Sequence, residues 1–475
     1  MLPILITQFA QAGFGLIDTI MAGHLSAADL AAIAEGVGLW IPVMLLFSGI
    51  MIATTPLVAE AKGARNTEQI PVIVRQSLWV AVILGVLAML ILSLCHFSYM
   101  CLAYQKVYNL KPVYSYMQLV WVCPLLTMYA ALRGYSEALG HPRPVTVISL
   151  LALVVLIPLN MIFMYGLGPI PALGSAGCGF ATSILKGLML ITLAGYIYKA
   201  SAYRNTSIFS RFDKISLTWV KRILQLGLPI GLAVFLKWVF LVQGMVLASR
   251  EVFIAAHQVA ISVTSVLFMI PLSLAIALTI RVGTYYGEKN WASMYQVQKI
   301  GLSTAVFFAL LTMSFIALGR EQIVSVYTQD INVVPVAMYL LWFAMAYQLM
   351  DALQVSAAGC LRGMQDTQAP MWITLMAYWV IAFPIGLYLG ALYRLGRTGV
   401  WLGLIIGLSI ACVLLLSRLY LNTKRLSRQT VIKQSDETCG LFYFMQIFAR
   451  GLAPICQTNG KSVRFTSQSP ITFSL

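Results

Sequence analysis

The chain has 475 residues, of which 60% are hydrophobic and only 10% are charged, and its mean hydropathy is +0.86. Soluble domains carry roughly 25% charged residues, so this composition excludes a soluble protein. A net charge of +16 would be typical of nucleic-acid binding in a soluble chain, but in a membrane protein lysine and arginine gather in the loops on one side. We therefore expect a chain that is surrounded by membrane lipid and has no nucleic-acid partner.

Apolar stretches of about 20 residues, which is enough for a helix to cross a bilayer, recur along the chain. We predict twelve transmembrane helices, at residues 2–22, 31–58, 77–100, 113–137, 145–166, 175–198, 222–249, 255–284, 297–318, 332–360, 370–393 and 398–420. They divide into an N-lobe (1–198) and a C-lobe (222–420), joined by a basic cytoplasmic linker (199–221). We expect the polar tail, 421–475, to be cytoplasmic and unstructured.

The two sets of six helices repeat each other. Gly63-Ala64-Arg65-Asn66 corresponds to Gly287-Glu288-Lys289-Asn290, and Leu132-Arg133-Gly134 corresponds to Leu361-Arg362-Gly363. Because each repeat has an even number of helices, both halves keep the same orientation, as in transporters whose halves are related by an axis along the membrane normal. The sequence therefore predicts an all-α polytopic membrane protein with two six-helix lobes related by a pseudo-two-fold axis.

The orientation follows from the lysines and arginines of the loops. The loops after the second, fourth, sixth, eighth and tenth predicted helices hold fifteen of these residues, and the opposite loops hold six. Cytoplasmic loops carry the excess of positive charge, so we expect both termini to face the cytoplasm.

Ionisable residues inside predicted spans are candidates for function, because a charge at the bilayer centre costs about 2.5 to 3.5 kcal/mol on insertion scales. Asp18 lies in the first span, and Gln8, Gln11 and Gly15 share its face of the helix. This polar stripe predicts that the face points inward, with Gln8 and Gln11 lining a cavity. The alternative is that Asp18 only touches the outer interface.

Asp351 lies near the middle of the tenth predicted span. Tyr347, Gln348 and Gln354 lie within one turn of it, so we assign these three side chains to the substrate cavity, together with Lys237. Lys237, deep in the seventh span, would be an unpaired ammonium without a carboxylate, and Asp351 is its expected partner. The alternative for Asp351 is a neutral acid that is hydrogen-bonded inside the bundle.

The remaining charges and motifs indicate transport rather than catalysis. Glu35, near the outer end of the second span, lies either in the cavity or at its mouth, and we interpret Lys186 as a packing residue with a snorkelling head group. No nucleotide-binding loop, zinc motif or hydrolase motif is present in the sequence. We therefore predict no enzyme activity and no cofactor, and uphill transport must use an ion gradient.

Five segments together resemble the multidrug and toxic compound extrusion (MATE) transporters, and specifically their bacterial NorM branch. The segments are Leu2-Pro3-Ile4-Leu5 with Gln8 and Gln11, Asp18-Thr19-Ile20-Met21-Ala22-Gly23, Leu30-Ala31-Ala32, Leu132-Arg133-Gly134-Tyr135, and Asp351-Ala352-Leu353-Gln354 with Leu361-Arg362-Gly363. The resemblance covers about residues 1 to 420.

The resemblance implies a twelve-helix antiporter of the bacterial inner membrane. Such a protein would expel small organic cations, including fluoroquinolones and dyes, in exchange for protons or sodium ions, and we expect a monomer. Asp18 resembles the carboxylate of the family that couples ion entry to export, and Asn160 resembles its polar neighbour. Asp351 resembles the coupling carboxylate of the C-lobe.

One residue departs from the pattern of the NorM branch. Lys237 stands where members commonly have a glutamate, and a lysine beside Asp351 would repel a bound sodium ion. This favours protons, or an ion site in the N-lobe. Three alternatives remain: a flippase for lipid-linked oligosaccharides, which Lys237 favours and the aspartates oppose; an intramembrane enzyme acting on lipid; and an inactive member of the family.

Overall fold

The computed structural model describes residues 1–25, 27–104, 120–166, 171–246, 251–328, 330–391 and 398–451. Over these residues the chain is entirely helical, without strands. By its internal contacts it divides into two units, Met1–Tyr420 and Leu421–Leu475. All candidate site residues belong to the first unit.

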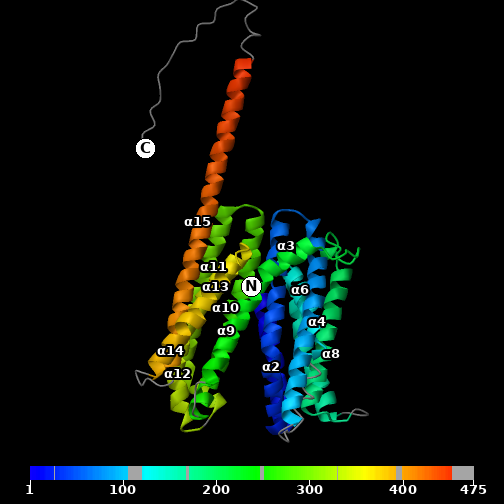
Figure 1. Ribbon diagram of the computed structural model, residues 1–475, viewed down its shortest axis with the longest axis vertical. Helices are drawn as coiled ribbons and strands as arrows, with labels where there is room; N and C mark the ends of the chain where they lie inside the picture. Colours follow the sequence, from blue (N-terminus) through cyan, green and yellow to red (C-terminus); the bar gives the residue numbers. More distant parts are fainter. Residues whose placement is uncertain are drawn as a thin grey trace, which may run out of the picture. The chain divides into compact units, whose positions relative to one another are not determined.

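The N-lobe contains the helices that precede residue 200. They are α1 (Leu2–Leu25), α2 (Ala27–Met51), α3 (Thr54–Gly63), α4 (Gln69–Tyr104), α6 (Cys123–Ala138), α7 (Arg143–Asn160), the π-helix η1 (Met161–Gly166) and α8 (Ser175–Lys199). Helix α6 packs against α4 and α8, and α7 packs against α1 and α8. Figure 1 shows α2, α4, α6 and α8 as one group of helices in blue to green.

The expected second span is divided into α2 and α3. Two turn-type hydrogen bonds, from Ile52 N to Gly49 O and from Ala53 N to Ile50 O, both 3.2 Å long, separate the helices. Pro56 lies in the first turn of α3, where its missing N–H leaves no helical hydrogen bond unmade. The break lets α3 take a direction different from that of α2.

The C-lobe begins after a short 3-10 helix, η2 (Ser201–Tyr203). Its helices are α9 (Leu217–Val246), α10 (Glu251–Gly287), α11 (Trp291–Tyr327), α12 (Val333–Gly363), α13 (Gln368–Leu375), the π-helix η3 (Met376–Ala382), α14 (Phe383–Ala391) and α15 (Thr398–Gly451). Helices α10, α11 and α12 pack against one another. Helix α15 continues through residues 421–451, so this part of the chain differs from the unstructured tail that the sequence predicts. Residues 452–475 lie outside the described chain.

The prediction of an all-helical polytopic membrane protein is confirmed. Among the described residues, eleven helices are long and apolar enough to cross a membrane. The span expected at 113–137 corresponds to α6, which has 16 residues, and the first part of that span lies outside the described residues.

Corresponding turns in the two halves have the same backbone conformation. Arg65 and Lys289 both adopt left-handed φ values, of 55° and 57°. Each turn is closed by two backbone hydrogen bonds in the same positions: from Ala64 to Glu60 and Asn66 to Ala61 in one, and from Glu288 to Thr284 and Asn290 to Tyr285 in the other. The repeat seen in the sequence is therefore also a structural repeat.

The segment between the lobes is fixed to the N-lobe. The Arg75 guanidinium on α4 pairs with the Asp213 carboxylate at 2.6 Å, and Trp79 Nε1 donates to the Asp213 carbonyl at 3.1 Å. Nearer α8, the Tyr203 hydroxyl lies 2.6 Å from the Ser136 hydroxyl, and burial raises the pKa of Tyr203. The segment is thus held against the ends of α4 and α6.

Candidate ion-coupling and substrate site

Asp18 points into the N-lobe. Its Oδ1 accepts a hydrogen bond from Asn160 Nδ2 at 2.7 Å, and its Oδ2 accepts one from Thr182 Oγ1 at 3.2 Å. These donors come from the end of α7 and the first third of α8, and both helices contact α1. The carboxylate therefore lies among three helices, which argues against a purely interfacial aspartate.

The surroundings of Asp18 include an unused acceptor. Asn160 is completely buried, and its Oδ1 has no hydrogen-bond partner among the described residues. Buried amide oxygens are usually bonded. Asn160 therefore provides an acceptor beside the carboxylate, which is suited to a proton carried by Asp18 or to a small cation.

Lys186 also belongs to this site, although the sequence favours a packing role for it. Its ammonium lies 4.1 Å from the centroid of the Phe14 ring and close enough to Asp18 to interact with it electrostatically. Cys178, Thr182 and Lys186 follow one another at intervals of four residues on α8, so they share one face of the helix. That spacing was the signal in the sequence that could have placed Lys186 beside Asp18.

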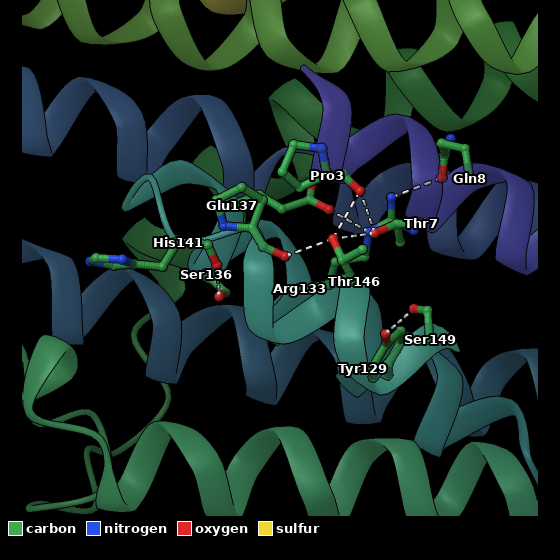
Figure 2. A network of polar contacts seen from close by, with 11 residues as sticks. Pro3, Thr7, Gln8, Tyr129, Arg133, Ser136, Glu137, His141, Thr146 and Ser149 are labelled. Carbon is green, nitrogen blue, oxygen red and sulfur yellow. Dashed lines mark hydrogen bonds and ion pairs between the residues drawn. The ribbon is translucent and has the colours of Figure 1, made fainter. Parts of the chain in front are cut away.

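Gln8 takes part in a different hydrogen-bond network, nearer the start of α1. Its Oε1 accepts a hydrogen bond from Arg133 Nη2 at 2.8 Å, and Arg133 Nε is paired with Glu137 Oε1 at 2.8 Å (Figure 2). Close by, the hydroxyls of Thr7 and Thr146 are 3.0 Å apart. The structure thus brings Gln8 to Arg133 rather than to Asp18.

The structure describes fewer contacts for two other predicted cavity residues, Gln11 and Glu35. Gln11 is partly exposed on α1 between Gln8 and Asp18. Glu35 belongs to α2, but its side chain lies outside the described part of the structure.

In the C-lobe, Asp351 on α12 forms an ion pair with Lys237 on α9. Asp351 is only 1% exposed, and the Lys237 ammonium also lies 4.8 Å from the centroid of the Phe268 ring. Among the described residues, Asp351 Oδ2 and Gln348 Oε1 have no hydrogen-bond partner. The partner expected for Lys237 is therefore present.

Aromatic side chains surround this pair of charges. Tyr378 donates from its hydroxyl to Gln354 Oε1 at 3.2 Å, and the Phe240 ring meets the Tyr378 ring edge to face at 5.3 Å. Tyr347, one turn before Asp351, packs against Trp401 with ring centroids 6.4 Å apart. The C-lobe site thus combines one buried ion pair with several aromatic faces.

One protein-family model matches this chain twice, once in each lobe. The MatE family model matches residues 3–162 and again residues 229–388. The two matches begin at residues 3 and 229, so the copies are 226 residues apart. The internal repeat predicted from short segments is therefore confirmed over most of both lobes.

Curated relatives match along most of the chain. The "Probable multidrug resistance protein NorM" of Acinetobacter baylyi is 69% identical over 432 residues, which cover 90% of this chain and 96% of the relative. The "Multidrug resistance protein NorM" of Vibrio cholerae is 37% identical over 425 residues, covering 88% of this chain and 93% of the relative.

Solved structures share the fold at low sequence identity. The outward-facing conformation of a multidrug resistance MATE family transporter has a TM-score of 0.80 at 20% identity. A transporter from Pyrococcus furiosus, described as having a binding pocket of reverse polarity that suggests a different function, has a TM-score of 0.81 at 20% identity. Each comparison covers 90% of this chain and 95% of the other.

Proposed function

The chain belongs to the MatE family of membrane transporters, and from this premise we propose that it exports organic cations in exchange for protons. Transport rather than catalysis is the activity of the family. The names of the NorM relatives from Acinetobacter and Vibrio support multidrug substrates. The observation that carries the proposal is the Asp18 carboxylate, enclosed by α1, α7 and α8 and bonded to Asn160 and Thr182.

Asp18 is the better coupling group of the two aspartates. The charge of Asp351 is already balanced by Lys237, and breaking a buried ion pair is strongly unfavourable. Asp18 accepts hydrogen bonds from the neutral groups of Asn160 and Thr182. Lys186 interacts with it electrostatically, but the described residues form no direct ion pair with Asp18, so it can bind a proton without breaking one. Lys237 also opposes a sodium ion at Asp351 by charge repulsion, which favours protons as the coupling ion.

Protonation of Asp18 would change its hydrogen bonds. As a carboxylate it only accepts, whereas a carboxylic acid also donates. The unbonded Oδ1 of Asn160 is the acceptor that can receive the new donor. The two protonation states therefore prefer different arrangements of α1 against α7, and a proton that enters from outside shifts the lobe from one state to the other.

The aromatic side chains of the C-lobe have the chemistry that binds organic cations. Phe240, Tyr347 and Tyr378 are buried in the core of the C-lobe in this structure. When the lobe opens, their faces attract cations and bury apolar surface. We propose that the drug binds beside these rings, while the proton binds at Asp18. Fluoroquinolones and cationic dyes are the substrates that the resemblance implies.

We further propose the bacterial inner membrane as the location. The ends of α3, α8, α10 and α12 and the turns after them hold the excess of lysine and arginine, so the positive-inside rule places them and both termini in the cytoplasm. The lobes would then comprise residues 1–198 and 222–420, with the linker at 199–221, the tail at 421–475 and the monomer as the working unit.

The test is transport of an ethidium-like cation in proteoliposomes, driven either by a pH gradient or by a sodium gradient. We expect the pH gradient alone to drive transport, and Asp18→Asn to abolish it. Glu68→Gln makes the same chemical change at an exposed carboxylate outside the spans and serves as the control. Transport at the normal rate in Asp18→Asn would contradict the proposal, and transport driven only by sodium would reject protons as the coupling ion.

A second candidate, flipping of an anionic lipid-linked sugar, rests on two lysines that lie deep inside membrane segments, Lys186 and Lys237. Each of them interacts with an aspartate in the same lobe, so neither is a free cation that could bind a phosphate. Export of organic cations is therefore the better account. Movement of a fluorescent lipid-linked phosphate in the same liposomes, without any movement of the dye, would favour flipping instead.

A further inference from the structure

Glu60 connects the two lobes at the end that carries the basic loops. Its carboxylate lies 3.0 Å from Arg222 Nη2, and it also accepts a hydrogen bond from Gln365 Nε2. Glu60 belongs to α3 of the N-lobe, Arg222 to α9, and Gln365 to the turn after α12. Three polar side chains from three elements thus meet across the boundary between the lobes.

The three side chains are arranged for mutual contact. Gln365 has a left-handed φ of 61°, and its Oε1 lies 3.5 Å from Arg222 Nη2. Arg222 also lies over the Trp219 ring, 5.5 Å from its centroid. Glu60 is 27% and Arg222 44% exposed, so water can replace these contacts when they separate.

Around Glu60 the backbones of α3 and α10 are in direct contact. A β-carbon on Gly63 would overlap the Thr284 carbonyl oxygen, and one on Gly287 would overlap the Glu60 carbonyl oxygen. A β-carbon on Gly283 would lie 3.1 Å from the Ala59 β-carbon. Gly63 and Gly287 are corresponding residues of the two repeats, so equivalent helix ends meet here.

A second close contact follows along α2 and α9. A β-carbon on Gly49 would lie 2.8 Å from Gly231 Cα, and one on Gly227 would lie 2.8 Å from Ile50 Cγ2. The lobes are therefore packed backbone to backbone on this side. A substrate cannot pass between them here unless these helices separate.

We propose that Glu60, Arg222 and Gln365 form a latch that holds the cytoplasmic side of the transporter closed. The assignment of this side to the cytoplasm, and the need to open it in each cycle, rest on the proposed function. Partly exposed ion pairs contribute only modestly to stability, so a latch of this kind can release and re-form. The latch then sets how often the transporter opens inward.

The direct test is the accessibility of Ala59, which is completely buried against α10. Ala59→Cys, in a protein whose native cysteines are replaced by serine, is labelled with a membrane-impermeant maleimide from the cytoplasmic side of inside-out vesicles. We expect Glu60→Gln and Arg222→Gln each to raise the labelling rate about three- to tenfold. The charge swap Glu60→Arg with Arg222→Glu should return the rate towards that of the unmodified latch.

Arg418→Gln is the matched control. It removes an ion pair of similar length, 2.9 Å, to Asp366, and both residues belong to the C-lobe. We expect the labelling rate in this variant to stay unchanged. The latch is rejected if Glu60→Gln labels no faster than Arg418→Gln, or if the charge swap labels as fast as the single variants.

A covalent version separates the latch from the transport proposal. Glu60→Cys and Gln365→Cys, joined by a short cleavable bis-thiol reagent, should stop both dye transport and labelling from the cytoplasm, and a reductant should restore them. If none of the proteins transports the dye but labelling follows the latch as expected, the transport proposal fails and the latch stands. Unchanged labelling after cross-linking would overturn the latch.

Discussion

Lys237 occupies a position in the membrane where an unpaired charge would be very unfavourable. It pairs with Asp351 in the core of the C-lobe and lies over the Phe268 ring. Such a pair does not have to stabilise the fold, since well-packed apolar residues often do as well. The pair instead affects ion binding. The Lys237 ammonium neutralises the Asp351 carboxylate, which could otherwise bind a cation from outside the protein.

This leads to a prediction for the free energy of unfolding. Lys237→Met leaves Asp351 as a buried, unpaired carboxylate, which should destabilise the protein by about 3 to 5 kcal/mol. The double variant Lys237→Met with Asp351→Asn should recover most of that loss. The measurement is thermal unfolding in detergent, and equal melting temperatures for the single variant and the unmodified protein would contradict the prediction.

Residue-level reasoning from the sequence succeeded where a charge had few alternatives. Lys237 and Asp351 were paired correctly because both lie deep in spans with few other charges. The sequence predicts that Gln8 lines a cavity, and the structure adds a partner that the sequence does not predict, Arg133, 125 residues away. The periodicity of a helix shows which residues share its face, but not which neighbouring helix supplies their partners.

At the scale of elements, close helix contacts depend on glycine. Helices α2 and α9 meet at Gly49 and Gly231, where no side chain fits between the backbones. In a bilayer, small residues at interfaces allow this approach, and van der Waals packing then holds the helices together. The contact is therefore sensitive to the volume of a side chain rather than to its polarity.

Gly49→Leu should consequently destabilise the protein by about 1 to 3 kcal/mol, because overpacking forces α2 and α9 apart. Gly195→Leu is the matched control, since a β-carbon at Gly195 meets nothing within 4 Å. Thermal unfolding of both variants checks the prediction. It fails if Gly49→Leu unfolds at the same temperature as Gly195→Leu.

Hydropathy found the membrane helices but not their internal structure. The run from 31 to 58 contains only one charged residue, Glu35, and none near the break after Met51, so the hydropathy does not reveal the division into α2 and α3. Helix α11 extends to Tyr327, nine residues beyond the predicted end at 318, because its last turns remain helical outside the apolar window. The π-helices η1 and η3 depend on packing against other helices, which periodicity does not describe.

For the whole molecule, two similar lobes carry dissimilar charges. The repeat preserves turns such as those at Arg65 and Lys289, but the carboxylate of the N-lobe is held by neutral donors and that of the C-lobe by a lysine. The two lobes therefore differ in one respect: Asp351 is in a direct ion pair with Lys237, whereas Lys186 interacts with Asp18 only electrostatically. This difference is the basis of our proposal that Asp18 couples proton entry to export.

The most direct test of this assignment is the reciprocal exchange, in which a gradient of the organic cation drives proton movement in proteoliposomes that contain a pH-sensitive dye. Coupling in a binding equilibrium is reciprocal, so the unmodified protein should move protons against the cation. Lys237→Met with Asp351→Asn should retain this exchange, and Asp18→Asn should lose it completely. Proton movement in Asp18→Asn, or its loss only in the C-lobe double variant, would contradict the account.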